Sequence, residues 1–320
     1  MSYLITGGTG FIGAYVTRML VQEGEKAVLY DVAPRQDIFD DLLSKEQIAL
    51  VRVIRGDITD LAHLIRIAKE HACTKVVHLA ALLSIASSAN PSLAVRVNCD
   101  GAANILELAR IVSIEKVVYA SSNTVFGPPE KYEQQFIPND APHYPSTVYG
   151  ACKSFNERLA EYYFDAYGVD SVGLRFPVVY GVGQREGAAS ILTEELIMKP
   201  ALGKPGKVPY GGDETLNWLY VEDAARGVLL ASRATAAKTR SFNIDGEICS
   251  MAVAVGYVKK RIPGADITFL TGRTGFAGNY DATRIREEIG YQPEWPLEKG
   301  IEAVIRAVQT KGRGERKRFP

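Results

Sequence analysis

The sequence predicts an α/β protein built on a doubly wound parallel sheet, and three observations carry this prediction. Short apolar runs alternate with amphipathic segments from the start of the chain. A glycine-rich turn joins the first apolar run, residues 3–5, to a helical pattern that begins at Phe11. Polar residues follow several of the apolar runs, and the carboxyl ends of parallel strands would bring such residues together.

The first part of the chain is expected to alternate strictly between strands and helices. Strands are predicted at residues 3–5, 27–30, 49–55, 75–81, 116–122 and 171–180, with helices at 11–20, 61–71, 91–112 and 149–167. Asp60 suits the N-cap of the second helix, and Gly168 suits the end of the last. This order implies right-handed βαβ units, which produce a parallel sheet covered on both faces.

The pattern changes after residue 181, where Gly, Pro and Lys are frequent up to residue 212. Further helices are predicted at 191–198, 222–232, 250–261, 281–289 and 297–308, and one strand at 241–244. We expect a first domain over residues 1–180, to which segments near 215–245 return. A smaller lobe over 181–320 would cover the ligand cleft and bind substrate. The basic segment 311–320 is expected to be a disordered tail.

Composition excludes several classes of protein. The 320 residues are 47% hydrophobic and carry 37 basic against 37 acidic side chains, so nothing favours nucleic acid or an anionic membrane. No apolar run approaches the ~20 residues of a spanning helix, and the first strand starts too early to leave room for a signal peptide. The cysteines lack metal-site spacing and the histidines do not cluster, so we expect no metal, free thiols and a cytoplasmic location.

The glycine turn is the first candidate binding site. Gly7, Gly10 and Gly13 recur every three residues, and Phe11 and Ile12 lie in the first turn of the helix that follows. Glycine lets the backbone approach a pyrophosphate closely, and the helix N-terminus offers unpaired N–H groups and partial positive charge. The alternative is a glycine-rich turn with no ligand.

Asp31 makes a dinucleotide the favoured ligand of that turn. It ends the second apolar run, eighteen residues after Gly13, where a carboxylate can accept hydrogen bonds from ribose hydroxyls. The same charge would repel a 2′-phosphate, so the prediction is NAD rather than NADP, although Arg35 could offset part of the repulsion. A carboxylate that only caps the strand end is the alternative.

Tyr149 and Lys153 form the candidate catalytic pair. Their i, i+4 spacing places both side chains on one face of a helix, where the ammonium should lower the pKa of the phenol and allow proton transfer. Ser121 and Ser122 end a predicted strand, and a hydroxyl there could orient a substrate oxygen toward Tyr149. Chance spacing and a serine that finishes a strand by bonding backbone are the alternatives.

Seven motifs in order carry a family resemblance. TGGTGFIG, Asp31, GDI at 56–58, HLAA at 78–81, ASSNTVFG at 120–127, YGACK at 149–153 and LRFPVVYG at 174–181 resemble the extended short-chain dehydrogenase/reductase family. That family includes UDP-galactose 4-epimerase and related epimerases, dehydratases and dehydrogenases. The resemblance spans about residues 3 to 230 and implies a Rossmann-type fold with NAD as cofactor.

The resemblance also implies a role for individual residues. Ser122, Tyr149 and Lys153 match the catalytic hydroxyl, the acid/base and its partner in hydride transfer at a secondary carbinol. The cofactor positions that match the family are Gly7, Gly10, Phe11, Ile12, Gly13, Asp31, Asp57, Ile58, Ala80, Ala81, Asn98, Ser121, Tyr149, Lys153 and Pro177. Among these, Asp57 is expected to meet adenine and Pro177 to pack beside the nicotinamide.

Departures from the family pattern narrow the range of candidate substrates. Nucleotide-sugar enzymes of the family commonly carry an asparagine where this chain has Val178 and Val179, and a diphosphate-binding arginine where it has Leu216. The acidic pair of the dehydratases is absent after Ser122. We therefore expect a small hydroxylated substrate, such as a sugar acid or polyol. The candidate substrate contacts are Ser84, Ser122, Asn123, Arg185 and Asn217.

Several functional alternatives stay open on the sequence alone. An epimerase would keep NAD bound, whereas a dehydrogenase would release NADH. A nucleotide-sugar 4-epimerase and a non-catalytic NAD-sensing protein are the other two readings. The helices at 91–112 and 149–167 match those that family members use in a four-helix dimer contact, so a homodimer is expected. Tyr162, Tyr163 and Phe164 would contribute to it, unless they pack within the chain.

Overall fold

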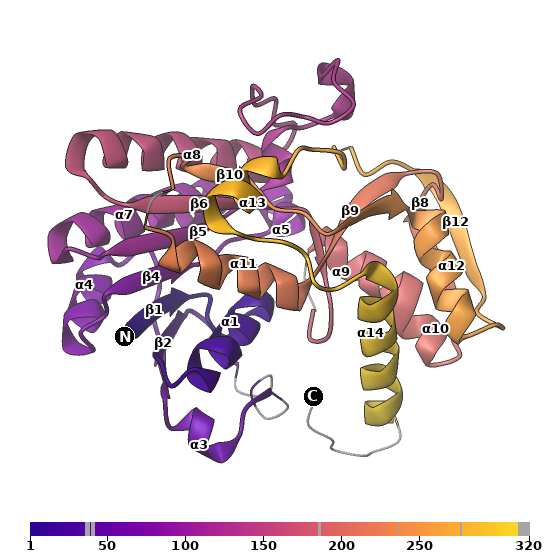
Figure 1. Ribbon diagram of the computed structural model, residues 1–320, viewed down its shortest axis with the longest axis horizontal. Helices are drawn as coiled ribbons and strands as arrows, with labels where there is room; N and C mark the ends of the chain where they lie inside the picture. Colours follow the sequence, from indigo (N-terminus) through magenta and orange to yellow (C-terminus); the bar gives the residue numbers. More distant parts are fainter. Residues whose placement is uncertain (36–38, 40–41, 185–186, 236, 276, 313–320) are drawn as a thin grey trace.

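A parallel sheet forms the larger part of the molecule (Figure 1). The computed structural model describes residues 1–35, 39, 42–184, 187–235, 237–275 and 277–312. Within these residues, seven strands pair in parallel in the order β10-β6-β5-β4-β1-β2-β3. They are β1 (Ser2–Thr6), β2 (Lys26–Asp31), β3 (Val51–Arg55), β4 (Lys75–His78), β5 (Lys116–Ser122), β6 (Ser171–Phe176) and β10 (Ser241–Asn243). The predicted doubly wound α/β fold is confirmed.

Helices cover both faces of this sheet (Figure 1). The helices α1 (Phe11–Gln22) and α11 (Val221–Arg233) lie on one face, and α4 (Leu61–Glu70), α7 (Gly101–Val112) and α8 (Val148–Tyr167) on the other. Successive strand residues point to opposite faces. Thus Tyr3 and Ile5 join the hydrophobic cluster of the first face, and Leu4 that of the second. The apolar runs are continuous where both faces of a strand are buried, as in β1.

Local signals fix several helix ends. The Asp60 side chain accepts a hydrogen bond of 2.9 Å from the His63 amide and so caps α4, as predicted. Thr147 caps α8 in the same way, and Gly168 ends that helix with a φ of 69°. The short α3 (Lys45–Ile48) begins with a capping box built on Ser44.

Two smaller sheets and further helices make up the second part of the chain. β7 (Val178–Tyr180), β9 (Thr215–Tyr220) and β11 (Glu247–Ser250) form one sheet, and β8 (Gly206–Tyr210) pairs with β12 (Ile267–Gly272). The helices of this part are α9 (Ala188–Thr193), η4 (Glu194–Met198), α10 (Lys199–Ala201), α12 (Met251–Arg261), α13 (Thr283–Ile289) and α14 (Leu297–Gly312). The strands β8, β9, β11 and β12 were not predicted from the sequence. β10 and α11 return to the large sheet, whereas β9 does not.

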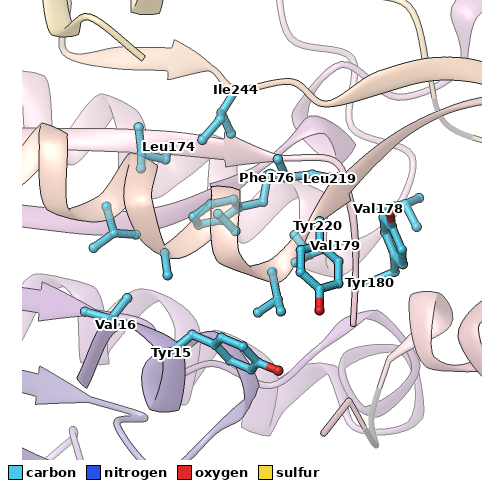
Figure 2. Close-up of a cluster of buried hydrophobic side chains, with 14 of the residues drawn as sticks. Tyr15, Val16, Leu174, Phe176, Val178, Val179, Tyr180, Leu219, Tyr220 and Ile244 are labelled. Carbon is cyan, nitrogen blue, oxygen red and sulfur yellow. The ribbon is translucent and has the colours of Figure 1, made fainter. Parts of the chain in front are cut away.

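The single strand predicted at 171–180 is two strands, and the boundary is Pro177. β6 pairs with β5 in the large sheet, whereas β7 pairs with β9 in the smaller one. Proline has no N–H for a ladder, so the chain can change sheets there without losing a bond. Figure 2 shows how buried side chains from both sides of this boundary, including Phe176 and Tyr180, pack into one cluster with Tyr220.

Two further predictions need correction. The strand predicted at 75–81 ends at His78, so Ala80 and Ala81 lie in the loop after β4. The helix predicted at 91–112 is α6 (Pro91–Val95) and α7, joined by a π-helical turn, η1 (Arg96–Asp100). That turn contains Asn98, whose amide is fully engaged with the loop after β4. A short helix, α5 (Ser84–Ala89), precedes α6.

No helix among the described residues is long and apolar enough to cross a membrane. The predicted tail lies mostly outside the described residues, because 313–320 are not among them and 311 and 312 close α14. The assignment of substrate binding to the second part of the chain stays a prediction.

Candidate active site

Most of the predicted site residues lie at one edge of the large sheet. The strand order runs outward in two directions from the pair β1 and β4, so the carboxyl ends of these two strands form the switch point where α/β proteins bind ligands. The predicted residues follow or end successive strands there: Gly7 (β1), Asp31 (β2), Asp57 (β3), Ala80 (β4), Ser122 (β5) and Pro177 (β6).

The glycine turn leaves no room for side chains. Gly7 has a φ of +66°, and a Cβ on it would lie 2.8 Å from the Ala80 nitrogen. A Cβ on Gly13 would lie 2.5 Å from the Gly7 carbonyl oxygen. The Gly10 amide donates to that same oxygen at 3.0 Å, and α1 then begins without a side-chain cap. The first amides of α1, from Phe11 onward, therefore lack a capping partner and can bind an anion.

Asp31 lies against the glycine turn. Its Oδ2 atom accepts a hydrogen bond of 2.6 Å from the Thr9 hydroxyl, and Oδ1 accepts one of 3.1 Å from the Ala33 amide. The half-buried carboxylate is therefore held at the end of β2, next to the turn that would hold a pyrophosphate. Sequence reasoning missed Thr9, although it is part of the TGGTG motif.

Asp57 and Ile58 follow β3, the strand next to β2 in the sheet. Asp57 accepts from the amide and hydroxyl of Thr59, each at 2.9 Å, which leaves its Oδ2 atom for a ligand. Ile58 is buried and fills the space beside Gly101, where a Cβ would lie 2.4 Å from the Ile58 Cδ1 atom. This close packing fixes the loop against α7.

The loop after β4 is held by Asn98. The Asn98 side chain accepts from the Leu82 amide at 2.8 Å and donates to the Leu82 carbonyl at 3.0 Å. Ala80 and Ala81 are half-buried in the same loop, and Ala80 contacts the glycine turn. Asn98 is 1% exposed, so it is neither a surface amide nor a free donor; it holds the loop that packs against the glycine turn.

The two serines at the end of β5 have different partners. The Ser122 hydroxyl accepts from the Thr124 amide at 3.2 Å and lies 3.4 Å from the Asn123 side-chain oxygen. Asn123 donates in turn to the Ala277 carbonyl at 3.0 Å. The Ser121 hydroxyl instead donates to Glu157 of α8. Ser121 therefore belongs to a buried polar network, whereas the Ser122 hydroxyl bonds within the turn that follows β5.

Tyr149 and Lys153 lie together in the first turns of α8. The Lys153 ammonium is 5.4 Å from the centre of the Tyr149 ring and donates a hydrogen bond of 2.7 Å to the Ala120 carbonyl of β5. Both side chains are buried, with exposures of 9% for Tyr149 and 2% for Lys153. The predicted pair and the predicted hydroxyl of Ser122 are thus brought to one place.

The electrostatics of this pair differ from the expectation. Burial raises the pKa of Tyr149 above its usual range, and the hydrogen-bonding contribution of Ser122 only partly opposes this. Burial also lowers the pKa of Lys153 to about 8. The expected lowering of the phenol pKa is therefore not produced by the protein groups alone. The physical reason is that neither charged form is solvated in this buried position.

The remaining predicted residues are dispersed. Ser84 is the first residue of α5, and Pro177 is half-buried between β6 and β7. Asn217 is 1% exposed, and its side-chain oxygen accepts from the Gly246 amide at 2.9 Å, so half of its amide is already used inside the fold. Arg185 lies outside the described residues.

A dinucleotide fits these residues. The turn packs backbone against backbone at Gly7 and Gly13, α1 starts without a side-chain cap, and Asp31 carries negative charge beside the turn. A comparison with known families decides the matter, because residues 3–245 match the model described as the NAD dependent epimerase/dehydratase family. The chain belongs to the NAD-dependent epimerase/dehydratase family. Its membership confirms the predicted resemblance, an enzymatic activity and NAD as the cofactor.

Known enzymes resemble the chain along most of its length. UDP-glucose 4-epimerase of Mycolicibacterium smegmatis is 28% identical, over 97% of this chain and 99% of the relative. UDP-glucuronate 4-epimerase of Thermodesulfobacterium geofontis is 31% identical, over 71% of this chain and 70% of the relative. The crystal structure of L-threonine dehydrogenase from Phytophthora infestans superimposes with a TM-score of 0.85 at 26% identity, over 97% of this chain and 100% of that chain.

Sequence reasoning missed three polar residues beneath the family site. His78 ends β4, and its Nδ1 atom lies 2.7 Å from the Thr6 hydroxyl. Burial and the nearby charge of Lys153 lower the pKa of His78 to about 3, so it is neutral. Glu157 and Arg175 form an ion pair behind Ser121, with a shortest separation of 2.7 Å. Glu157 continues the i, i+4 series of Tyr149 and Lys153, and that spacing is the signal that could have found it.

Proposed function

We propose that the protein is an NAD-dependent dehydrogenase or epimerase that acts at a secondary carbinol of a small hydroxylated substrate. The observation that carries the proposal is the arrangement of Ser122, Tyr149 and Lys153, which lie together and buried beside β5, the strand next to the switch point of the sheet. A group of this kind, beside a dinucleotide turn, can move a proton on a hydroxyl while hydride moves on carbon.

Each of the three side chains has a distinct role in this proposal. Tyr149 takes the proton of the substrate hydroxyl as a phenolate when hydride leaves the carbon, and returns it as a phenol in the reverse direction. Ser122 donates a hydrogen bond to the same substrate oxygen and orients it. Lys153, fixed by the Ala120 carbonyl, supplies positive charge beside the phenol and can bind ribose hydroxyls. NAD, when bound, supplies the hydride acceptor at the nicotinamide ring.

Leu216 favours a small substrate over a nucleotide sugar. It occupies the position of a diphosphate-binding arginine, yet it is fully buried on β9, opposite Cys249 of β11. A doubly charged diphosphate would lose its charge-assisted partner at this position. The L-threonine dehydrogenase with a TM-score of 0.85 is an example of a similar fold whose named substrate is a small hydroxylated molecule. Ser84, Asn123, Arg185 and Asn217 remain the proposed substrate contacts.

A substrate screen tests this proposal. NADH formation and isomer formation are followed with L-threonine, D-glucuronate, D-galacturonate and sorbitol, and 4-epimerisation with UDP-glucose and UDP-glucuronate. We expect turnover of a member of the first group and little of the second. Activity on the UDP-sugars alone would overturn the small-substrate proposal and favour a nucleotide-sugar 4-epimerase, the activity named for the two sequence relatives.

The fate of the cofactor separates the two reaction types. An epimerase must reoxidise NADH before release, so it is expected to purify with close to one NAD per chain. A dehydrogenase exchanges its cofactor in every cycle and should purify largely without it. The amount of NAD released on denaturation, divided by the amount of protein, measures this ratio directly and does not depend on knowing the substrate.

We also propose a homodimer through α6, α7 and α8, in the reducing environment of the cytoplasm. Apolar side chains with at least 40% exposure gather on these helices: Leu93, Val95, Ile111, Phe155, Tyr162, Phe164 and Tyr167. Tyr163, in contrast, is half-buried, and its hydroxyl donates to Glu107. Sedimentation of the protein and of Tyr162→Arg tests the proposal. A monomeric wild-type protein would contradict it.

A further inference from the structure

A buried ion pair joins β6 to α8, and its carboxylate also bonds the end of β5. The Arg175 guanidinium of β6 donates to Glu157 of α8 from Nε at 3.0 Å and from Nη2 at 2.7 Å. The Ser121 hydroxyl of β5 donates to the same carboxylate. Glu157 is 1% exposed and Arg175 5% exposed, so both charges are removed from water.

The ion pair is held from several sides. Burial by itself would raise the pKa of the Glu157 carboxyl, but the charge and hydrogen bonds of Arg175 outweigh this, and the pKa lies below its usual range. Arg175 also donates to the Asn139 carbonyl at 2.6 Å and to the Asn243 side chain at 3.2 Å. Ser121, Arg175 and Asn243 are direct register partners on β5, β6 and β10. The pair is therefore the centre of a row across three strands.

Stability alone does not account for this arrangement. A buried ion pair loses the solvation of two charges, and well-packed apolar residues of similar volume often stabilise a fold as much or more. What the pair provides is directional contact, because a guanidinium and a carboxylate meet in a fixed geometry. Its third partner, Ser121, is directly followed by Ser122, and Glu157 lies on the same face of α8 as Tyr149 and Lys153.

We propose that Glu157 and Arg175 are positioning residues, which act through Ser121 to fix Ser122 relative to Tyr149. Lys153 makes one tie between α8 and β5 through the Ala120 carbonyl, and Glu157 makes a second through Ser121. Together they hold the strand end and the helix in one register. The inference rests on the proposed roles of Ser122 and Tyr149.

The test removes the second tie and leaves the ion pair intact. In crystals of Ser121→Ala with NAD, the distance between the Ser122 and Tyr149 hydroxyls should change by more than about 0.5 Å, the tolerance of a catalytic arrangement. With the screened compound that the wild-type protein turns over, kcat should fall about tenfold or more, because small displacements at a reacting centre are costly. The NAD affinity should not change, since the Ser121 hydroxyl donates to Glu157 and is 2% exposed, which differs from the cofactor contact that the sequence predicts for it.

A matched control lies at the other end of the same strand. Lys116 begins β5 and pairs with Asp170 at 2.8 Å, and Arg240 pairs with Asp170 at the same distance. Asp170→Asn should lower the melting temperature while it leaves both the hydroxyl distance and kcat at wild-type values. Glu157→Gln should resemble Ser121→Ala; if it does not fold, Ser121→Ala and the control decide.

Each outcome either supports or overturns the inference. An unchanged distance between the Ser122 and Tyr149 hydroxyls in Ser121→Ala, together with a normal kcat, would overturn the inference. An equal change of that distance in Asp170→Asn would overturn it too. A loss of NAD affinity in Ser121→Ala would return Ser121 to the cofactor site and also overturn it. Tyr149→Phe, measured in the same assay, keeps the two proposals apart. If that variant retains turnover the proposed function fails, whatever Ser121→Ala does.

Discussion

The Lys153 ammonium lies 5.4 Å from the centre of the Tyr149 ring, on the same face of α8. Neither group faces bulk water, and the ammonium donates a hydrogen bond to the Ala120 carbonyl. A buried phenol beside a buried amine can exchange protons only with groups that enter the site. This favours proton transfer to a bound substrate over loss of the proton to solvent.

Replacing Tyr149 with phenylalanine tests the acid/base role. The change removes one oxygen and leaves the ring, so NAD binding should persist while turnover falls by more than ~100-fold. Tyr163→Phe is the matched control, because Tyr163 lies on the same helix and its hydroxyl bonds Glu107, away from the site. Steady-state rates and NAD titration measure both. Near-normal turnover of Tyr149→Phe would remove it from catalysis.

The buried lysine should make stability depend on pH. Burial lowers the pKa of Lys153 to about 8 from 10.5, so between these values the unfolded chain binds a proton that the folded protein does not. The free energy of unfolding of the wild-type protein, relative to Lys153→Met, should therefore rise as pH increases from about 8 to about 10.5. Below pH 8 the folded state must bury the charge, and the lysine costs stability there.

Urea unfolding of both proteins, freed of NAD, at a series of pH values measures this difference. The comparison cancels the many tyrosines that titrate in the same range, since both proteins share them. A difference that stays constant across the range would mean that the ammonium is solvated in the folded state, in contradiction to its 2% exposure.

Gly7→Ala should damage both the fold and cofactor binding. The new Cβ would lie 2.8 Å from the Ala80 nitrogen and 2.9 Å from its Cα, at a φ of +66°. We expect the free energy of unfolding to fall by more than about 3 kcal/mol and the NAD complex to be at least tenfold weaker, because the turn must move.

Gly24→Ala is the control: Gly24 has a φ of +77° but no heavy atom within 4 Å of the new Cβ. It should cost only about 1 kcal/mol and leave NAD binding intact. Equal effects of the two changes on NAD affinity would show that backbone strain, and not the contact with Ala80, matters.

Local signals carried most of the fold prediction. Apolar periodicity, the cap at Asp60 and the glycine end at Gly168 are read from a few neighbouring residues, and the structure has them where they were expected. The strands β8, β9, β11 and β12 depend on partners far along the chain, such as Trp218 opposite Glu247. β8 also contains a proline, which is typical of a weak or edge strand. No local sequence pattern predicts such long-range strand pairing.

The candidate site divides in the same way. Glycine spacing and the i, i+4 pair of Tyr149 and Lys153 are short-range patterns, so the sequence could reveal them. The engagement of Asn98 with Leu82, and of Ser121 with Glu157, joins residues from different elements and depends on how these pack. The pKa of Tyr149 could not be predicted either, because burial, the largest influence on it, is a property of the whole fold.

Leu216→Arg tests whether the loss of the diphosphate-binding arginine is alone responsible for the difference from the nucleotide-sugar enzymes of the family. The Leu216 side chain is fully buried, and Cys249 lies opposite it in the antiparallel pair β9 and β11. The segment at Gly278 is also close, since a Cβ there would lie 3.2 Å from the Leu216 Cα. An arginine would therefore be buried without a partner, and we expect a loss of about 3 kcal/mol or more with no gain in UDP-glucose binding.

Leu216→Met is the control for this change, because it conserves volume without charge and should cost less than about 1.5 kcal/mol. Thermal unfolding and calorimetric titration with UDP-glucose measure both variants. If Leu216→Arg instead folds normally and binds UDP-glucose tightly, the position faces the substrate cleft. A single substitution would then separate this chain from the nucleotide-sugar enzymes of its family. If the arginine only destabilises, the difference lies in the packing of β9 between Cys249 and Gly278, and the cleft itself is shaped for a smaller molecule.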